Sequence, residues 1–280
     1  VPTKALVSDI LKRLKDKMYK KYLIVASKKD KAGINITTQL SQFGKYDFYL
    51  VEEEMIYTKN LDLDRINQYD FIIFASRHQS EKGDKALTIH APGNWRQAQY
   101  GGEETKVCPV SALFMKQAFE LLNKNAKHHN LKDYKVTMEA THHGTLIDKP
   151  CMFIEIGSSE NEWVSRKAGF IIAKTIRDII DEFHENPYNE IAIGIGGPHY
   201  CPNFNKIQLT SNFAISHVIA QYATPLSEEM IKQAVDNTEE DVDFVLLDWK
   251  GIKNADERKR IIEILDKLYL NYKKTSEIKK

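Results

Sequence analysis

Short apolar runs alternate with longer amphipathic segments along most of the chain. The short runs are rich in β-branched and aromatic residues, contain no proline and are bounded by turn residues, which is typical of β-strands. They cover residues 22–26, 46–51, 69–75, 134–140, 151–156, 190–195 and 243–248. The longer segments carry apolar residues at helical spacing, and they cover residues 33–43, 109–126, 160–184, 206–222 and 253–271. This alternation predicts an α/β fold with a mostly parallel, twisted sheet and helices on both faces.

Two regions differ from this pattern. Residues 1–20 predict an amphipathic helical extension, either packed on the domain edge or acting as a basic arm that contacts nucleic acid. Its apolar positions are Val7, Ile10, Leu11, Leu14 and Met18. Residues 21–280 contain no repeat or low-complexity linker, which favours a single α/β domain. Within that domain, residues 77–108 predict a long loop, and such loops inside compact domains are usually functional.

Composition sets further limits. At 42% hydrophobic, the 280 residues can form a substantial core. No apolar run approaches the roughly 18 residues of a membrane span, and the sequence opens with no signal-peptide pattern, so the expected location is the cytoplasm. Cys108, Cys151 and Cys201 are too scattered for a disulfide framework or a zinc knuckle, and we expect Cys151 to be a small core residue. The net charge of +1 is uninformative alone, but 32 lysines against 8 arginines are compatible with a phosphate-binding surface.

Reactive polar residues follow five of the predicted strands. In an open parallel sheet the carboxyl ends of the strands share one edge, where ligands bind. Residues far apart in the sequence would therefore meet there, and the pattern predicts an active site. The clusters are Ser27-Lys28-Lys29-Asp30, Ser76-Arg77-His78, Thr141-His142-His143-Gly144, Gly157-Ser158-Ser159-Glu160 and Gly196-Gly197-Pro198-His199-Tyr200.

Histidines and one carboxylate carry most of the expected chemistry. Adjacent residues leaving a strand point to opposite sides, so His142 and His143 can share one role only if the chain turns at Gly144. Glu155 lies in an otherwise apolar strand, where an unpaired carboxylate is costly to bury, so it must meet a cation, a metal or a histidine. The candidate catalytic residues are His142, His143, Glu155 and His199. The candidate metal ligands are His78, His90, His142 and His199, since histidine either ligates metals or moves protons.

Other residues near the same edge are candidates for substrate binding. Arg77 suits a phosphate or carboxylate, and Trp95 is either a stacking platform or a core anchor. The glycines after residue 195 let backbone N–H groups approach an oxyanion. Ser159 and Glu162 form a capping signature, so the serines either cap a helix or open an anion site. The complete candidate set is Lys28, Arg77, Asn94, Trp95, Ser158, Ser159, Gly196 and Gly197.

The sequence contains no GxGxxG fingerprint, P-loop, HExxH or GxSxG motif. Histidines with a carboxylate but without a nucleophile elbow favour hydrolysis by an activated water, which is either bound to a metal or deprotonated by histidine. Zinc takes such nitrogen and oxygen ligands and leaves a position open for water in catalytic sites.

The same segments resemble the archaeal and plant type of D-aminoacyl-tRNA deacylase, in order over roughly residues 21–250. The matching stretches are Ser27–Ile36, Glu54–Tyr57, Ala75–His78, Gly93–Trp95, Tyr100–Gly102, Glu139–Gly144, Phe153–Glu160 with Trp163, and Gly194–Tyr200 with Pro202. The resemblance implies hydrolysis of the ester between a D-amino acid and the 3′-terminal adenosine of tRNA, with broad D-amino-acid specificity. It also implies Zn²⁺ as cofactor, and a fold akin to peptidyl-tRNA hydrolase and purine nucleoside phosphorylases.

Two departures from the family pattern and two rival functions remain. Thr145 stands where a proline often follows the His-His-Gly sequence, and residues 4–20 precede the usual start of the family. The rivals are a non-catalytic nucleotide- or RNA-binding α/β protein and a nucleoside phosphorylase-like enzyme. The second would need a phosphate site built from Arg77, Ser158 and Ser159. The expected partner is tRNA charged with D-amino acids, with no membrane or obligate protein partner, and the protein is expected to be a monomer or a small homo-oligomer.

Overall fold

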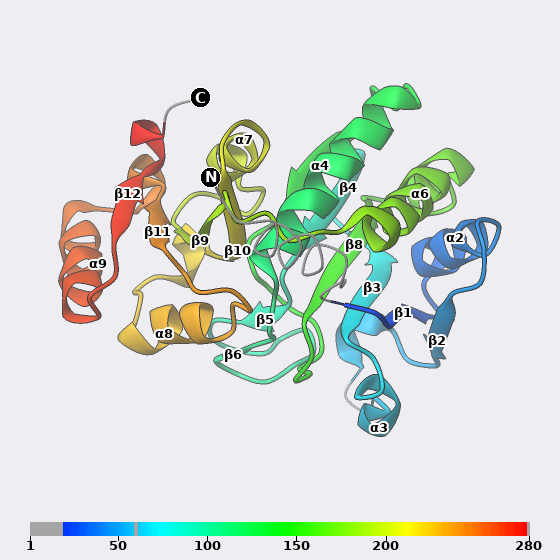
Figure 1. Ribbon diagram of the computed structural model, residues 1–280, viewed down its shortest axis with the longest axis horizontal. Helices are drawn as coiled ribbons and strands as arrows, with labels where there is room; N and C mark the ends of the chain where they lie inside the picture. The colour runs from blue at the N-terminus through cyan, green and yellow to red at the C-terminus, as the bar shows by residue number, and fades with distance from the viewer. Residues whose placement is uncertain (1–18, 59–60, 279–280) are drawn as a thin grey trace, which may run out of the picture.

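A computed structural model describes residues 19–58 and 61–278. In this part of the chain the strands form a six-stranded sheet, a four-stranded sheet and a two-stranded pair, with the two larger sheets side by side (Figure 1). The predicted N-terminal helix falls almost entirely on residues 1–18, which lie outside the described residues. Among the described residues, no helix has the length and apolarity needed to cross a membrane.

The six-stranded sheet is mixed, and its strand directions determine where the polar clusters lie. Strands β2, β1, β3 and β8 run parallel, whereas β4 runs antiparallel to β8 and β7 runs parallel to β4. The carboxyl ends of β4 and β7 therefore point away from those of β3 and β8. In spatial order the strands are β2 (Asp47–Val51), β1 (Tyr22–Ser27), β3 (Phe71–Arg77), β8 (Cys151–Gly157), β4 (Ala86–His90) and β7 (Lys135–Met138).

The four-stranded sheet is entirely parallel. Its spatial order is β10 (Phe213–Ile219), β9 (Glu190–Ile195), β11 (Phe244–Leu247) and β12 (Tyr272–Lys274). The short pair β5 (Gly93–Asn94) and β6 (Lys106–Val107) is antiparallel. Because Gly93 would place an added Cβ 2.5 Å from the Cα of Val107, only glycine allows this close pairing.

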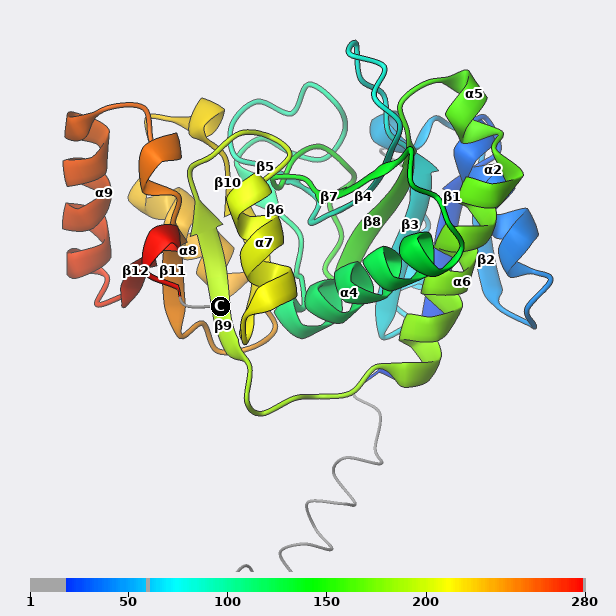
Figure 2. The same cartoon turned by 90° about the horizontal axis from the view of Figure 1, so that it is seen from above.

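Helices cover one face of the six-stranded sheet, and mainly loops cover the other. The helices α2 (Lys31–Leu40), α4 (Ala112–His128) and α6 (Arg166–Glu182) pack on the first face (Figure 2). The second face carries the short helix α3 (Leu63–Ile66). Around the four-stranded sheet lie α7 (Pro202–Thr210), α8 (Glu228–Asp236) and α9 (Ala255–Lys267), and α5 (Glu160–Trp163) precedes α6. Short 3₁₀ helices cover Met55–Tyr57, Gln221–Ala223, Trp249–Gly251 and Thr275–Glu277.

Alternation along β8 separates the core from the candidate site. Met152, Ile154 and Ile156 belong to the apolar cluster beneath α4 and α6, so the residues between them, Phe153 and Glu155, face the loop-covered side. The same cluster includes Ile215 of β10, so the two larger sheets share one continuous core.

All seven predicted strands are present within a few residues of their expected bounds. The helix predicted over 206–222 is wrong: α7 ends at Thr210, and Phe213–Ile219 form β10, because this β-branched and aromatic run is buried at every position. The predicted loop 77–108 contains β4, whose residues are likewise all buried. The predicted helix 160–184 is interrupted at Val164-Ser165, where Ser165 caps α6.

Candidate active site

The loop-covered face of β8 brings together the five candidate histidines. His78 follows β3 and His90 ends β4, while His142 and His143 follow β7 and His199 follows β9. The expectation that the polar strand ends share one edge is wrong for β7, which runs opposite to β8, and His90, expected in a loop, ends β4, which also runs opposite to β8. His90 instead pairs with Phe153, two residues before Glu155. The cluster therefore lies on the face of the sheet, and the histidines reach it from both strand directions.

The turn at Gly144 lets both adjacent histidines enter the cluster. His143 has φ +29° and Gly144 has φ +101°, and the ring centroids of His142 and His143 lie 4.2 Å apart. A Cβ on Gly144 would lie 2.9 Å from the Cβ of Pro92 and 3.0 Å from the Phe153 ring, so this turn requires glycine. Both histidines are thus available to one reacting centre.

Two fully buried carboxylates lie among the histidine rings. Glu139 Oε1 is 2.9 Å from Nδ1 of His78, and its Oε2 is 3.3 Å from Nε2 of His142 and 3.5 Å from Nε2 of His199. Glu155 lies 3.8 Å from His78 Nδ1 through Oε2 and 3.8 Å from His90 Nε2 through Oε1. Both carboxylate side chains have no exposed surface, so the expectation that Glu155 meets histidines is met.

The hydrogen bonds of two histidines aim lone pairs at these carboxylates. Nδ1–H of His142 donates to the carbonyl of Ala140 at 2.8 Å, and Nδ1–H of His90 donates to that of Ala91 at 3.1 Å. In the neutral rings Nε2 then carries no hydrogen. Within the described chain, no hydrogen-bond partner reaches His90 Nε2 or any carboxylate oxygen of Glu139 and Glu155. Acceptors facing acceptors in a buried site require a cation or a proton between them.

Burial and neighbouring charges shift the pKa values of the cluster residues in opposite directions. Burial, followed by the neighbouring histidines, holds the pKa of His142 and of His143 well below the usual value. Burial also acts to lower the pKa of His78 and His90, but the carboxylates of Glu139 and Glu155 raise both above the usual value. Burial acts to raise the pKa of Glu139, yet His199, His78 and His142 hold it well below its usual range. The two carboxylates thus favour the protonated form of His78 and His90, whereas burial favours the neutral form of His142 and His143.

Two cavities adjoin the cluster. The larger measures about 810 Å³ and the smaller about 490 Å³, and their shared lining residues are Tyr100, His142 and His143. His78, Glu155 and His199 line the larger cavity only. A substrate bound across both would have its middle at the histidine pair.

Of the polar candidates at the other strand ends, most are already paired. Arg77 forms an ion pair with Glu54 at 3.1 Å and lies over the Trp163 ring at 5.2 Å, and it lines the larger cavity. Ser158 donates to the carbonyl of Asp84. Ser159 and Glu162 form the expected capping box, with the Ser159 hydroxyl 2.6 Å from the carboxylate. Lys28 is exposed, is paired with Glu52 and lines neither cavity.

The remaining candidates have structural partners. Asn94 donates to the carbonyl of Gly101 at 2.9 Å. Trp95 is 5% exposed and its Nε1–H donates to the carbonyl of Val218 at 3.3 Å, which favours the core-anchor alternative. Gly196 and Gly197 have φ +95° and +77°, but their N–H groups donate to the carbonyls of Ile219 and Gly251. They are therefore not free to bind an oxyanion, and neither lines the two cavities.

Sequence reasoning did not assign a role to Glu139, Tyr200 or Tyr222. Glu139 follows the apolar positions Val136 and Met138, so the argument that singled out Glu155 applies equally to it. The hydroxyl of Tyr200 lies 2.8 Å from Nε2 of His78, and that of Tyr222 lies 3.0 Å from Nδ1 of His199. The sequence places Tyr200 in a polar cluster after a strand, but no sequence signal marks Tyr222, whose contact with His199 depends on the fold.

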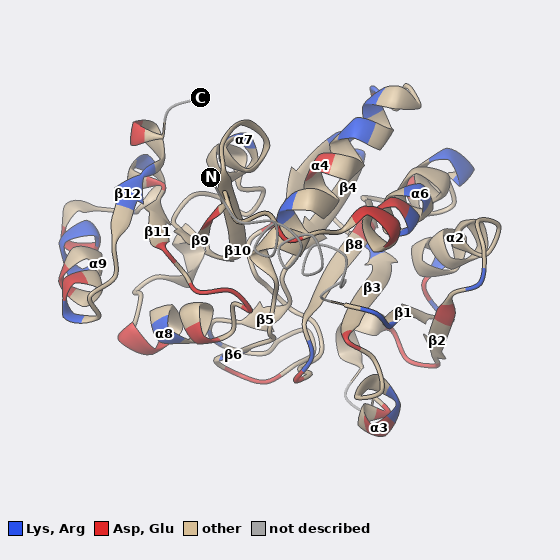
Figure 3. Cartoon of the chain, in the orientation of Figure 1, with Lys and Arg blue, Asp and Glu red and all other residues tan. Residues whose placement is uncertain are grey.

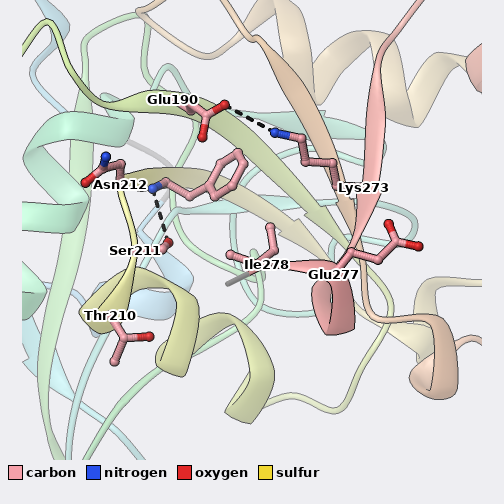
Figure 4. Close-up of a pocket in the computed structure, with 8 residues that line it drawn as sticks. Glu190, Thr210, Ser211, Asn212, Lys273, Glu277 and Ile278 are labelled. Atoms are coloured by element: carbon pink, nitrogen blue, oxygen red, sulfur yellow. Dashed lines mark hydrogen bonds and ion pairs between the residues drawn. The ribbon is translucent and has the colours of Figure 1, made fainter. Parts of the chain in front are cut away.

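A third cavity, of about 450 Å³, lies at the opposite end of β9 (Figure 4). Glu190, the first residue of β9, forms an ion pair with Lys273 at 3.2 Å there. No histidine lines this cavity, and its main charged groups are paired with each other. The histidine cluster is therefore the better candidate for chemistry.

Comparison with known proteins shows the family to which this chain belongs. The sequence profile of the family described as D-aminoacyl-tRNA deacylase matches residues 65–273. The D-aminoacyl-tRNA deacylase of Pyrococcus abyssi is 39% identical over 254 residues, which are 82% of this chain and 92% of that protein. The chain belongs to the D-aminoacyl-tRNA deacylase family. The D-aminoacyl-tRNA deacylase of Methanocaldococcus jannaschii is 34% identical, over 88% of this chain and 96% of that protein.

The family fold also occurs in a solved structure. The crystal structure of a conserved protein of unknown function, AF0625, superposes with a TM-score of 0.84 at 30% identity, covering 92% of this chain and 96% of that one. The mostly parallel α/β architecture predicted from the sequence is thereby confirmed, as is membership of the D-aminoacyl-tRNA deacylase family.

Proposed function

We propose that this protein hydrolyses the ester bond between a D-amino acid and the terminal adenosine of tRNA, releasing the free D-amino acid and the tRNA. The observation that carries the proposal is the cluster of five histidines and two buried carboxylates, placed between two cavities in a chain of this family. The proposed substrate is charged tRNA, so we expect the protein to act in the cytoplasm, where tRNA is aminoacylated.

The protonation states support a general-base role for the histidine pair. An aminoacyl ester is already activated, so a positioned water suffices and no covalent nucleophile is needed. Neutral His142 or His143 would accept the proton of the water as its oxygen attacks the ester carbon. The bond to the ribose oxygen then breaks, and the imidazolium returns the proton to that oxygen. The carboxylate of Glu139, within 3.3 Å of His142, would stabilise the transient positive charge.

We further propose that the cluster holds a zinc ion. Its donor atoms suit zinc, which binds histidine nitrogen and carboxylate oxygen, and the unpartnered oxygens of Glu139 and Glu155 call for a cation. Metal-bound histidines usually donate their second ring N–H to a carbonyl, as His142 and His90 do here. A bound zinc ion would supply Lewis-acid activation of water. Two candidate ligand groups leave His143 free as the base: Glu139 with His142 and His199, and His78 with Glu139 and Glu155. The third group, His90 with His142 and His143, would use both histidines as ligands and leave water activation to the metal.

The rival functions have less support. A phosphorylase-like enzyme needs a free phosphate site, but the guanidinium of Arg77 is paired with Glu54 and the hydroxyls of Ser158 and Ser159 are bonded to neighbouring residues. A role in binding alone does not explain why two carboxylates are buried without hydrogen-bond donors, since such burial is energetically costly.

One assay tests both parts of the proposal. Release of tyrosine from D-Tyr-tRNA and L-Tyr-tRNA should be compared at equal enzyme, before and after dialysis against a chelator. We expect hydrolysis of the D-ester only, loss of activity on dialysis and recovery with added Zn²⁺. Equal rates on both esters, or none on either with zinc present, would contradict the proposed function. If elemental analysis finds no metal in the dialysed protein and its activity is still full, the proposed hydrolysis stands but the zinc ion is ruled out.

A further inference from the structure

Two half-exposed tyrosines line the larger cavity. Tyr57 is 49% exposed and Tyr100 is 50% exposed, although most large apolar side chains of the described chain are buried. Both line the larger cavity, and their ring centroids lie 6.2 Å apart with the planes tilted by 47°. Paired exposed aromatic rings beside a cavity commonly mark a binding surface.

Backbone packing fixes both rings relative to the histidine pair. The N–H of Gly144, directly after His143, donates to the carbonyl of Tyr100 at 3.1 Å. Gly101 has φ +67°, and an added Cβ there would collide with the carbonyl oxygen of Ile56. The segments that carry Tyr57, Tyr100 and His143 therefore touch through their backbones, so the distance from the rings to the reacting centre is set by the fold.

The two tryptophans near the cluster are less available for stacking. Trp95 is buried and bonded to Val218. Trp163 also lines the larger cavity, but its Nε1–H donates to the carbonyl of His78 at 3.0 Å and Arg77 lies over its ring. The stacking role that the sequence offered to Trp95 thus fits Tyr57 and Tyr100 better.

We propose that Tyr57 and Tyr100 form the platform on which the terminal adenine of the tRNA substrate stacks. This inference rests on the proposed function and names the residues that hold the nucleotide. A base stacked there remains connected to the bulk of the tRNA outside the cavity, because the rings are half-exposed. The ribose ester then reaches His142 and His143, which line the same cavity as Tyr100, and the aminoacyl group extends into the smaller cavity.

The platform is tested first by binding, without reference to turnover. Adenosine 5′-monophosphate serves as the probe of the terminal nucleotide, and equilibrium dialysis measures its Kd. Stacking of one base on an aromatic side chain changes binding by roughly 5- to 150-fold. The double variant Tyr57→Ala, Tyr100→Ala should therefore raise Kd by at least about fivefold, while Tyr57→Phe and Tyr100→Phe, which keep the ring face, should not. Tyr188→Ala, at an 82% exposed tyrosine just before β9, is the matched control.

Kinetics then separate the platform from a structural role. For D-Tyr-tRNA, the double alanine variant should raise KM by the same factor and leave kcat within about threefold, since a lost binding contact chiefly raises KM. An unchanged Kd for the nucleotide, or wild-type binding undetectable at about 10 mM, overturns the platform. If the double alanine variant instead loses affinity for free D-tyrosine, the aminoacyl side chain and not the adenine contacts these rings, and the proposed platform is overturned. Absence of D-Tyr-tRNA turnover in the wild type contradicts the proposed function and leaves the nucleotide result to stand on its own.

Discussion

Two buried carboxylates among five histidines are the residue-level feature that determines the chemistry of the site. Glu139 and Glu155 have no exposed side-chain surface, and no donor in the described chain satisfies their oxygens. Such groups are retained only where a cation or a proton compensates them. They raise the pKa of His78 and His90 above the usual value, whereas burial keeps His142 and His143 neutral.

The neutral pair gives the first residue-scale prediction. His142→Ala or His143→Ala should lower kcat on D-Tyr-tRNA by at least about 10²-fold, because a general base contributes about 10²–10⁴ to the rate. The KM should change little, since neither substitution removes a contact to the tRNA body. Single-turnover rates measure the effect, and circular dichroism checks that each variant is folded. If both variants keep kcat within a few-fold of the parent, the reacting centre must lie nearer His78, His90 and His199.

His217, a buried histidine outside the cluster, predicts how the stability of the protein depends on pH. The Thr141 hydroxyl lies 3.2 Å from Nδ1 of His217, and Nε2–H of His217 donates to the carbonyl of Asn237 at 3.2 Å. Burial lowers the pKa of His217 from 6.5 to about 4. The unfolded chain therefore binds the proton more tightly, and the stability from this group is complete above pH 6.5 and is lost as pH falls towards 4.

Urea denaturation at several pH values measures this loss, which amounts to roughly 3 kcal/mol for the two pKa values. His217→Gln can keep both hydrogen bonds but does not titrate, so its free energy of unfolding should fall less between pH 7 and pH 4 than that of the wild type. The exposed residue His184 provides the control variant His184→Gln. Parallel pH curves for wild type and His217→Gln would show that His217 is not buried as a neutral ring.

At the scale of elements, the sequence predicts strands better than their directions. Most of the predicted strands exist because their β-branched and aromatic runs are buried on one or both faces, whereas in β2 only Val51 is buried. The segment 206–222 has an ambiguous pattern, because the spacing of Ile207, Ile215 and Val218 also fits a helix. The helix ends before Ser211-Asn212, and the strand β10 follows with every position buried. Nothing local in β4 encodes that it runs antiparallel to β8, since the two runs are equally apolar.

The loop that carries Tyr100 yields an element-scale prediction with an internal control. Gly101 and Gly83 have nearly identical φ, +67° and +68°, but an added Cβ meets the Ile56 carbonyl at Gly101 and nothing within 4 Å at Gly83. Gly83→Ala should therefore cost only the left-handed strain, about 1 kcal/mol. Gly101→Ala should lower the free energy of unfolding by about 1–3 kcal/mol more, because the added Cβ overpacks the site. It should also lower activity by displacing Tyr100 and Gly144. Urea midpoints at constant m-value measure the difference, and equal costs would refute the proposed backbone contact.

At the scale of the molecule, a shared core joins the two sheets and brings distant segments to one site. His199 follows β9 of the second sheet, yet lies 3.5 Å from Glu139, which follows β7 of the first. The sequence identifies the histidines, since they recur after strands, but not Glu139 or the tyrosines that bond to them. Those roles depend on the register between sheets, and no local pattern records that register.

The charge distribution gives the last prediction, on how the substrate binds. Lysines and arginines are spread over the helices and loops, intermixed with acidic residues (Figure 3), so a net charge of +1 does not describe any one face. Lys28 and Lys31 are paired with Glu52 and Glu160. Lys29, after β1, and Lys82, beside the cavity-lining Glu81, are exposed and have no ion pair among the described residues. These two lysines are accordingly free to contact tRNA phosphates.

Each such contact releases counterions, so log KM for D-Tyr-tRNA should rise linearly with log salt concentration, provided that KM reports binding. Removing one phosphate contact should reduce this slope by about 1. Lys29→Ala and Lys82→Ala together should therefore flatten the salt dependence, weaken binding at low salt and leave kcat unaltered. Lys259→Ala is the control, because Lys259 is also exposed but is paired with Glu263 and lies on α9, beside the four-stranded sheet and away from the histidines. A flat salt dependence in the wild type would argue against phosphate tracking altogether. If the slope of log KM against log salt concentration is unchanged in the double variant, other lysines contact the tRNA phosphates. Those lysines must still let the acceptor end reach His142 and His143.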